Sequence, residues 1–160
     1  MQVIDNFLEP ENFKALQDNI FNPYFPWYVM PGVTEVKNEN KDHWLLTHHF
    51  YKDYEVCSRF FKPLSDVIVK LDMRSIIRIK ANLYPRTDKR IEHDFHSDYE
   101  YSHKSGLYSL NTNNGFTIMG DGKKIESVAN RMIIFDASKP HKSTTCTDKN
   151  FRTNIVFNYF

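Results

Sequence analysis

Two widely separated segments of the chain alternate between apolar and polar residues. In residues 77–84 the apolar positions are Ile77, Ile79, Ala81 and Leu83, and the polar positions are Arg78, Lys80, Asn82 and Tyr84. In residues 152–159 one set is Arg152, Asn154, Val156 and Asn158, and the other is Thr153, Ile155, Phe157 and Tyr159. A period of two places each set on its own face of a strand. We therefore expect two strands whose polar faces line one shared interior.

Two other segments have the spacing of amphipathic helices. The first begins at Glu9-Pro10-Glu11, because proline is tolerated at the first helical position and acids are favoured near the positive end of the helix. Its apolar face is formed by Phe13, Leu16 and Ile20. The second covers residues 63–71, with Leu64, Val67, Ile68 and Leu71 at core-facing positions. We expect both helices to back the sheet.

The remaining pattern predicts short strands joined by turns. Strands are expected at residues 3–8, 107–111 and 132–135, with turns at Asn113-Asn114-Gly115 and Asp121-Gly122. Residues 22–35 are rich in proline and aromatics, which favours an irregular covering segment. The predicted fold is α+β and mainly β: an antiparallel double-stranded β-helix, or jelly roll, backed by N-terminal helices.

Composition sets the size and the broad class of the protein. A chain of 160 residues with 41% hydrophobic content suits one packed domain, which we assign to residues 1–160. The net charge of +1 gives no broad reason to expect a nucleic-acid partner, although a local basic patch is compatible with one. Two cysteines without metal or redox spacing, and no membrane-length apolar stretch, favour a soluble protein of the reducing cytoplasm.

Four residues carry a chemical pattern. His96 and Asp98 are two positions apart, so on an extended backbone both side chains leave the same face. His141 follows after several predicted strands, enough to return the chain to the same end of a barrel, and Arg152 lies on the last strand. Two imidazoles and one carboxylate form the facial triad of non-haem Fe(II) oxygenases. The arginine fork suits the distal carboxylate of a dicarboxylate such as 2-oxoglutarate.

The other histidines fit a metal site less well. His93 and His96 form a His-x-x-His pair that is compatible with zinc, but the glutamate of a helical metalloprotease motif is missing. His48 and His49 would point to opposite faces of a strand, so both cannot bind one ion. We expect His43, His48, His49 and His103 not to be ligands, while His93 is a candidate pocket residue.

The chain resembles the 2-oxoglutarate/Fe(II) oxygenases of the prolyl 4-hydroxylase type, particularly the small single-domain versions encoded by marine phages. The resemblance spans most of the chain, and its carriers are Val3-Ile4-Asp5-Asn6-Phe7-Leu8, Asn82-Leu83-Tyr84-Pro85, His96-Ser97-Asp98, Asn111-Thr112-Asn113-Asn114-Gly115, Asn130-Arg131, Phe135-Asp136, His141 and Arg152. It implies that His96, Asp98 and His141 are catalytic iron ligands. It further implies that Arg152 and Tyr84 bind 2-oxoglutarate.

One feature departs from that family. A second pocket tyrosine of many prolyl hydroxylases would fall at or beside Ser109 here, so contacts from that strand to the cosubstrate rest on Ser109. The strand register after Arg152 adds Asn154 and Asn158 as candidate pocket residues. The cofactors implied by the resemblance are Fe(II), 2-oxoglutarate and O2, with ascorbate as an accessory reductant.

By the same resemblance, the expected reaction is hydroxylation of peptidyl proline, with succinate and CO2 as the other products. Trp27, Tyr28 and Trp44 are candidates to cradle an extended peptide, although completing the core is the commoner role of such residues. The basic segment Pro85-Arg86-Thr87-Asp88-Lys89-Arg90 is either a loop over the substrate or a solvated surface loop.

Two other functions stay open. Asn82-Leu83-Tyr84 and Arg152-Thr153-Asn154 echo the nucleic-acid dealkylases of the AlkB type, but that family carries a second arginine where this chain has Asn158. A barrel without catalysis that serves as an interaction domain is the third reading, because fold alone does not establish function. Free amino acids and small metabolites also remain open as substrates.

Overall fold

The described residues form two antiparallel sheets and two short α-helices. The structure is a computed structural model that describes residues 1–32 and 44–160. The large sheet has the strand order β1 (Gln2–Ile4), β9 (Arg131–Asp136), β6 (Lys104–Ser109), β11 (Phe151–Tyr159), β5 (Ile76–Pro85), β3 (Leu45–Lys52) and β2 (Tyr28–Met30), with β4 (Glu55–Val56) paired to β3. The small sheet has the order β10 (His141–Ser143), β7 (Asn113–Met119) and β8 (Lys124–Ser127).

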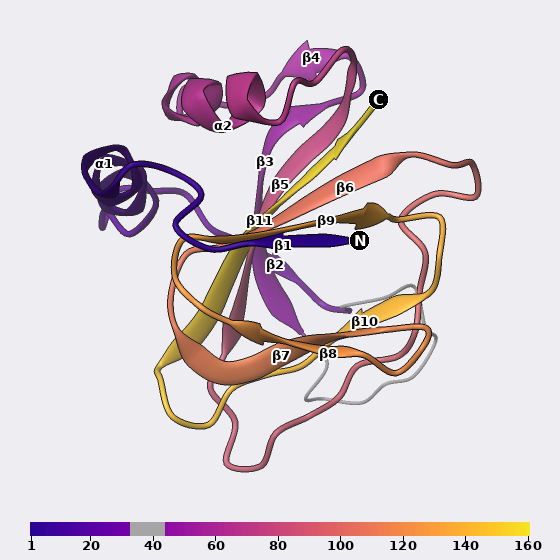
Figure 1. Cartoon of the computed structure of the whole chain (residues 1–160). Helices are drawn as coiled ribbons and strands as arrows, with labels where there is room; N and C mark the ends of the chain where they lie inside the picture. The colour runs from indigo at the N-terminus through magenta and orange to yellow at the C-terminus, as the bar shows by residue number, and fades with distance from the viewer. Residues whose placement is uncertain (33–43) are drawn as a thin grey trace.

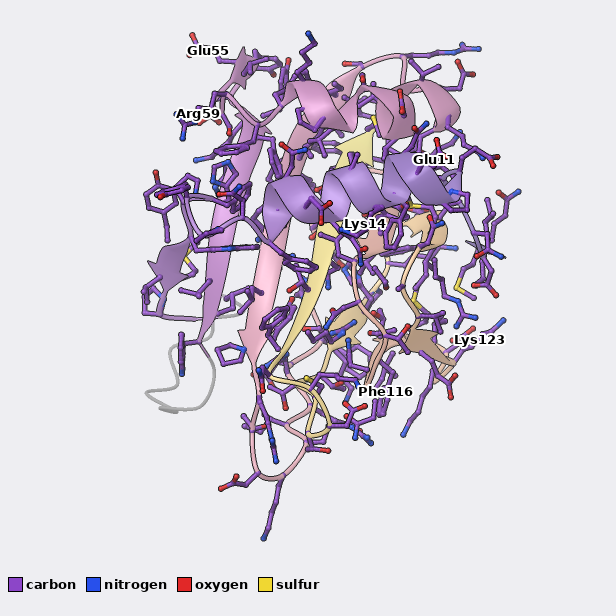
Figure 2. The ribbon with its side chains drawn as sticks, turned by 90° about the vertical axis from the view of Figure 1, so that its left-hand side faces the viewer. Glu11, Lys14, Glu55, Arg59, Phe116 and Lys123 are labelled. Carbon is purple, nitrogen blue, oxygen red and sulfur yellow. The ribbon has the colours of Figure 1, made fainter. Side chains whose placement is uncertain are left out.

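The helices and the small sheet lie on opposite sides of the large sheet (Figure 1). The two helices are α1 (Pro10–Ile20) and α2 (Ser65–Lys70), and a 3-10 turn at Lys62–Leu64 precedes α2. In Figure 2, α1 lies across the large sheet, with Glu11 and Lys14 labelled on it. The predicted jelly-roll core backed by helices is confirmed. Among the described residues, no helix is long and apolar enough to cross a membrane.

The two alternating segments are neighbouring strands of the large sheet. β11 pairs antiparallel with β5, and the cross-strand pairs of one face are Arg152 with Tyr84, Asn154 with Asn82, Val156 with Lys80 and Asn158 with Arg78. Directly opposed residues of an antiparallel pair point to the same side of the sheet. The two polar faces therefore meet in the space between the sheets, as the alternation predicts.

The other face of the same strands packs on the helices. Ile79, Phe157 and Tyr159 belong to one cluster of buried residues with Leu16 of α1 and Val67 of α2. A smaller cluster fills part of the space between the sheets, and it consists of Leu107, Met119, Ile125, Ile133, Phe135, Ala137 and Val156. Each fully buried side chain of this size contributes about 1.5–3 kcal/mol of hydrophobic stabilisation. The core thus fixes which face of β5 and β11 remains polar.

The local predictions have mixed outcomes. The turn at Asp121-Gly122 is confirmed, since Gly122 has φ +85° and its N–H donates to the Met119 carbonyl at 2.8 Å. The turn predicted at residues 113–115 is wrong, because β7 begins at Asn113. The strand predicted at residues 3–8 ends at Ile4. The covering segment contains the short strand β2, and its residues 33–35 lie outside the described residues.

Asn130 connects the N-terminal segment to the large sheet. Its backbone has φ 63°, a left-handed conformation that asparagine tolerates better than most residues. Its side-chain Oδ1 accepts hydrogen bonds from the Leu8 N–H at 2.9 Å and from the Tyr108 hydroxyl, and its Nδ2 donates to the Leu8 carbonyl at 2.8 Å. One buried amide therefore serves three partners.

We predict that Asn130→Ala lowers the free energy of unfolding by about 3 kcal/mol, because buried partners are left without hydrogen bonds and alanine is strained at a positive φ. Chemical denaturation of the variant and the parent protein measures the change. The control is Asn19→Ala in α1, whose side chain makes only a solvent-exposed hydrogen bond to the Ala15 carbonyl, and which should change stability by about 0.5 kcal/mol or less. Equal effects of the two substitutions would contradict the proposed role of Asn130.

Candidate metal centre

Three of the predicted site residues converge at one edge of the space between the sheets. His96, Asp98 and His141 each offer one atom that can bind a metal, and these three atoms lie within 4.8 Å of one another. The backbones of His96 and His141 form an isolated β-bridge, with two N–H···O bonds of 2.9 Å. The Asp98 N–H donates to the Ala137 carbonyl at 3.0 Å. Backbone pairing across 45 positions of sequence therefore sets the spacing of the three side chains.

Second partners orient these side chains. His141 Nδ1 lies 3.1 Å from the Lys139 carbonyl, which favours a proton on Nδ1 and leaves Nε2 with its lone pair. Asp98 accepts a hydrogen bond from Asn158 Nδ2 at 2.8 Å and one from Arg78 Nη2 at 3.3 Å. Carbonyl, amide and guanidinium groups of this kind commonly support metal ligands.

The electrostatic setting favours the protonation states that a metal needs. Burial by itself would raise the pKa of the Asp98 carboxyl, but Arg78, His141 and the Asn158 hydrogen bond outweigh it and lower the pKa. Burial, followed by the nearby His141, lowers the pKa of the His96 imidazole. At neutral pH the carboxylate is therefore ionised and the His96 imidazole is neutral, as metal binding requires.

The donor set fits a divalent transition metal. Two imidazole nitrogens and one carboxylate oxygen match the facial arrangement that binds non-haem Fe(II). A closed structural zinc site would have a fourth protein ligand, and no fourth His, Cys, Asp or Glu joins this group among the described residues. The geometry therefore suits a metal that keeps open positions for other ligands.

Arg152 is a buried cation behind this centre, with 1% of its surface exposed. Its guanidinium donates to Ser127 Oγ at 2.7 Å, Thr117 Oγ1 at 2.9 Å and the Thr144 carbonyl at 2.9 Å. An arginine has five N–H groups, so two remain. No carboxylate pairs with Arg152 in the part of the chain that the structure describes. A buried guanidinium without an anion is costly, which points to a bound carboxylate.

Tyr84 completes this end of the pocket. Its ring lies 5.5 Å from the Arg152 guanidinium carbon, and burial raises the pKa of its phenol above the ordinary value. The phenol therefore keeps its proton and can donate a hydrogen bond. His93 stacks on the Tyr84 ring at 5.4 Å, and its Nδ1 lies 2.8 Å from Ser143 Oγ. His93 thus supports the wall of the pocket.

A small cavity connects the triad to Tyr84, whereas Arg152 does not line it and reaches it through its contacts with Tyr84 and Thr117. The cavity has a volume of about 50 Å³ and is lined by both predicted histidine ligands, by Asp98, and by polar residues of β5 and β11, including Tyr84 and Asn154. A wider cleft of about 830 Å³ adjoins it, and the residues that line both are Arg78, Lys80, His96 and Asp98. The candidate metal centre therefore lies where a narrow inner cavity meets an open cleft.

The other predicted pocket residues have distinct positions. Asn154 lines the cavity, whereas Asn158 reaches it through its hydrogen bonds to Asp98 and Arg78. Ser109 is buried in β6 but does not line the cavity. The sequence interpretation assigned no role to Arg78 and Lys80, although the period of two on β5 already placed both on the polar face.

Comparisons with known proteins agree with this fold. No family model matches the sequence, and no curated protein matches it. A prolyl hydroxylase from Trichoplax adhaerens, solved in complex with a peptide fragment of the hypoxia inducible factor oxygen degradation domain, aligns with a TM-score of 0.69 at 16% identity, over 99% of this chain and 82% of that one. A prolyl-4-hydroxylase from Pseudomonas putida aligns with a TM-score of 0.65 at 15% identity, over 99% and 91%.

A third similar structure is that of an enzyme with a different reaction. The non-haem alpha ketoglutarate dependent epimerase SnoN from nogalamycin biosynthesis aligns with a TM-score of 0.67 at 10% identity, over 99% of this chain and 76% of that one. The chain therefore has the fold of the 2-oxoglutarate/Fe(II) oxygenases. Because one fold carries both hydroxylases and an epimerase, the reaction has to be argued from the site.

We predict that Asp98→Ala abolishes tight binding of a divalent metal, because it removes the only anionic member of the triad. Titration with Co(II), followed by its visible absorption, measures this loss directly. The matched control is Asp94→Ala, an exposed aspartate four positions earlier, which should bind Co(II) like the parent protein. Parent-like binding by the Asp98 variant would place the metal elsewhere.

Proposed function

We propose that residues 1–160 form a single Fe(II)- and 2-oxoglutarate-dependent oxygenase domain. The observation that carries the proposal is the convergence of His96, Asp98 and His141 within 4.8 Å, in a cavity that Tyr84 also lines, together with a buried Arg152 that contacts Tyr84 and keeps two N–H groups uncommitted. A metal-binding triad alone would fit many reactions. A triad with a buried receptor for a carboxylate fits a metal enzyme that uses a dicarboxylate cosubstrate.

The protein groups have separable roles in this proposal. His96, Asp98 and His141 hold Fe(II), while Arg152 and Tyr84 bind the distal carboxylate of 2-oxoglutarate. When bound, iron and cosubstrate supply the oxidising power: O2 delivers one oxygen atom to a C–H bond of the substrate and one to succinate, with release of CO2. Leu107, Phe135 and Val156 make part of the cavity wall apolar, which limits the access of water.

Hydroxylation of a prolyl residue is the reaction that we propose. The structure from Trichoplax adhaerens holds a peptide, which shows that the shared fold accommodates one in that protein. In this chain Tyr28 is 62% exposed and Trp44 is 40% exposed, so both offer aromatic surface to a proline ring, whereas Trp27 packs against the core. Trp27 therefore has the role of a core residue, and Tyr28 and Trp44 are the aromatic side chains that we propose for contact with the substrate.

Nucleic-acid dealkylation is the second candidate. A local basic patch supports it: Arg90 and Lys124 each lie 4.8 Å from the ring of Phe116 in β7, which is labelled in Figure 2. Against it, the position of the second arginine is Asn158, whose amide is engaged with Asp98 and Arg78. Turnover of methylated oligonucleotides with none on proline compounds would reverse the order of the two candidates.

Mass spectrometry tests the proposed reaction. Purified protein is incubated with Fe(II), 2-oxoglutarate, ascorbate and either proline peptides or free proline. A product that carries one added oxygen atom, formed together with succinate, supports the proposal. If the protein binds no Fe(II) and consumes no 2-oxoglutarate with any of these compounds, the non-catalytic interaction domain is the correct reading.

Arg152→Ala should weaken the binding of 2-oxoglutarate by about 10- to 100-fold, because it removes a charge-assisted hydrogen bond. Co(II) affinity should stay close to that of the parent protein, since Arg152 is not one of the triad. Calorimetric titration of each variant with the metal and then with 2-oxoglutarate separates the two effects. Unchanged cosubstrate affinity would remove Arg152 from the proposed site.

Gly115→Ala, like Arg152→Ala, should weaken the binding of 2-oxoglutarate, although it removes no charged group. A methyl group at this position would lie 2.8 Å from Arg152 Cδ and 2.9 Å from the Thr145 carbonyl oxygen, so the arginine has to move. The control is Gly122→Asn, where nothing lies within 4 Å and asparagine tolerates the positive φ. If both variants bind 2-oxoglutarate with equal affinity, the exact placement of the Arg152 side chain does not matter for binding of the cosubstrate.

A further inference from the structure

Lys80 is a cation at the proposed site that has no assigned role. It lies on the polar face of β5, is half-buried, and lines both the inner cavity and the adjoining cleft. Its ammonium group forms no hydrogen bond or ion pair with any residue that the structure describes. Burial, followed by the charge of Arg78, lowers the pKa of Lys80 to about 8, against an opposing effect of Asp98. The side chain is therefore still mostly protonated at pH 7.

Arg78 extends this positive region. Its Nη2 donates to Asp98 Oδ1 at 3.3 Å and to Asn158 Oδ1 at 3.1 Å. Its Nε is buried and has no hydrogen-bond partner among the described residues. The guanidinium carbon lies 5.4 Å from the centre of the Tyr99 ring, which lines the same cleft. A buried donor without an acceptor is costly unless a ligand supplies the acceptor.

His49, on the neighbouring strand β3, is also affected by the positive charges of Lys80 and Arg78. It is the cross-strand partner of Lys80, so its side chain leaves the same face of the sheet. Burial, followed by the charges of Lys80 and Arg78, lowers the pKa of the His49 imidazole to about 4. The imidazole therefore adds no positive charge at neutral pH, and it offers a neutral hydrogen-bonding group beside Lys80.

The charges around the site do not balance. Arg78, Lys80 and Arg152 carry three positive charges, and Asp98 carries one negative charge, which leaves an excess of two positive charges. Fe(II) and the dianion of 2-oxoglutarate cancel each other, so the loaded site keeps this excess. A half-buried cation that forms no ion pair with a described residue favours the binding of an anion.

Two neighbouring acids do not remove the excess. Glu92 is paired with Lys142 at 2.7 Å, and Lys142 is itself a cation that lines the cavity. Glu100 lies at the exposed rim of the cleft, where water screens its charge. Within the described part of the chain, the inner end of the cleft therefore remains positive.

We propose that Lys80, with Arg78 beside it, binds a carboxylate of the substrate that is oxidised. This rests on the proposed oxygenase function and narrows its substrate to free or C-terminal proline, in preference to an internal proline of a neutral peptide. A carboxylate is attached directly to the proline ring in these compounds. One ion pair at Lys80 would therefore hold the ring at the inner end of the cleft, next to the candidate metal centre.

The position of Lys80 favours the substrate over the cosubstrate. Lys80 lies four residues from Tyr84 along β5, which corresponds to about 13 Å at the usual strand rise. Tyr84 lines only the inner cavity and contacts Arg152, whereas Lys80 also lines the wide cleft together with Tyr99. A ligand that enters through the cleft meets Lys80 before it reaches the pocket of Arg152.

The test compares two ligands that differ only in charge. N-acetyl-L-proline carries the carboxylate, and N-acetyl-L-prolinamide has the same shape without it. Each is titrated into the metal-free full chain, with the NMR signals of the lysine side chains as the readout. We expect the acid to shift the Lys80 signal and to bind about 10- to 100-fold more tightly than the amide, as for a charge-assisted hydrogen bond.

Three variants make the test specific. Lys80→Met keeps the length of the side chain and should remove the preference for the acid, and Lys80→Gln repeats the test with a polar group in case methionine disturbs folding. Lys14→Met is the control, because Lys14 lies on the exposed side of α1 (Figure 2) and should keep the full preference. Equal binding of acid and amide by the parent protein, or no binding of either, overturns the proposal.

Two further comparisons separate the possible failures. The peptides N-acetyl-Pro-Glu-amide and N-acetyl-Pro-Gln-amide show whether a side-chain carboxylate is bound instead, and a preference for the first over both acid and amide of proline would overturn the assignment to free or C-terminal proline. Iron-dependent consumption of 2-oxoglutarate is measured on the same protein. Consumption without a preference for the acid rejects the Lys80 subsite alone, and the opposite result rejects the oxygenase function alone.

Discussion

The pairing of β11 with β5 is the constraint on which the rest of the structure depends. Its register places Arg152 opposite Tyr84 and Asn158 opposite Arg78, all on the side that faces the small sheet. Because side chains alternate along a strand, a slip of one residue would turn Arg152 toward the helices and bring Thr153 into the pocket. The hydrophobic core formed by the opposite face prevents this slip, so the packing of α1 and α2 indirectly orients the polar site.

The site itself is held by backbone contacts between segments that are distant in sequence. The bridge between His96 and His141 brings the chain before β6 to the first residue of β10, at the edge where the two sheets meet. Its ligand atoms are therefore positioned by the ends of strands and by hydrogen bonds of Asp98 to β5 and β11. A site built in this way is preorganised by the scaffold and needs little rearrangement to accept a metal.

Among the described residues, the polar interior holds more cations than anions. Arg152 is buried and Lys80 is half-buried, and neither has a carboxylate partner in the part of the chain that the structure describes. Such groups reduce the stability of the folded protein, and a ligand that supplies the missing anion restores it. In the proposed function, the stability lost at Arg152 would be regained on binding of the cosubstrate, and the stability lost at Lys80 on binding of the substrate.

The sequence by itself determined the elements with a strong local period. Short stretches of sequence show the alternation of apolar and polar residues in β5 and β11, the apolar face of α1, and the spacing of His96 and Asp98. They do so because side chains repeat every 2 residues along a strand and about every 3.6 residues along a helix. Tertiary structure decided the rest. Asn113-Asn114-Gly115 has the composition of a turn but begins a strand, because Asn113 pairs with Ser127 of β8 and Asn114 is hydrogen-bonded to Thr147 and Asp148, more than 30 positions away. The lack of an ion-pair partner for Lys80 among the described residues likewise cannot be read from the local sequence, since a charge is neutralised by neighbours in space and not by neighbours in sequence.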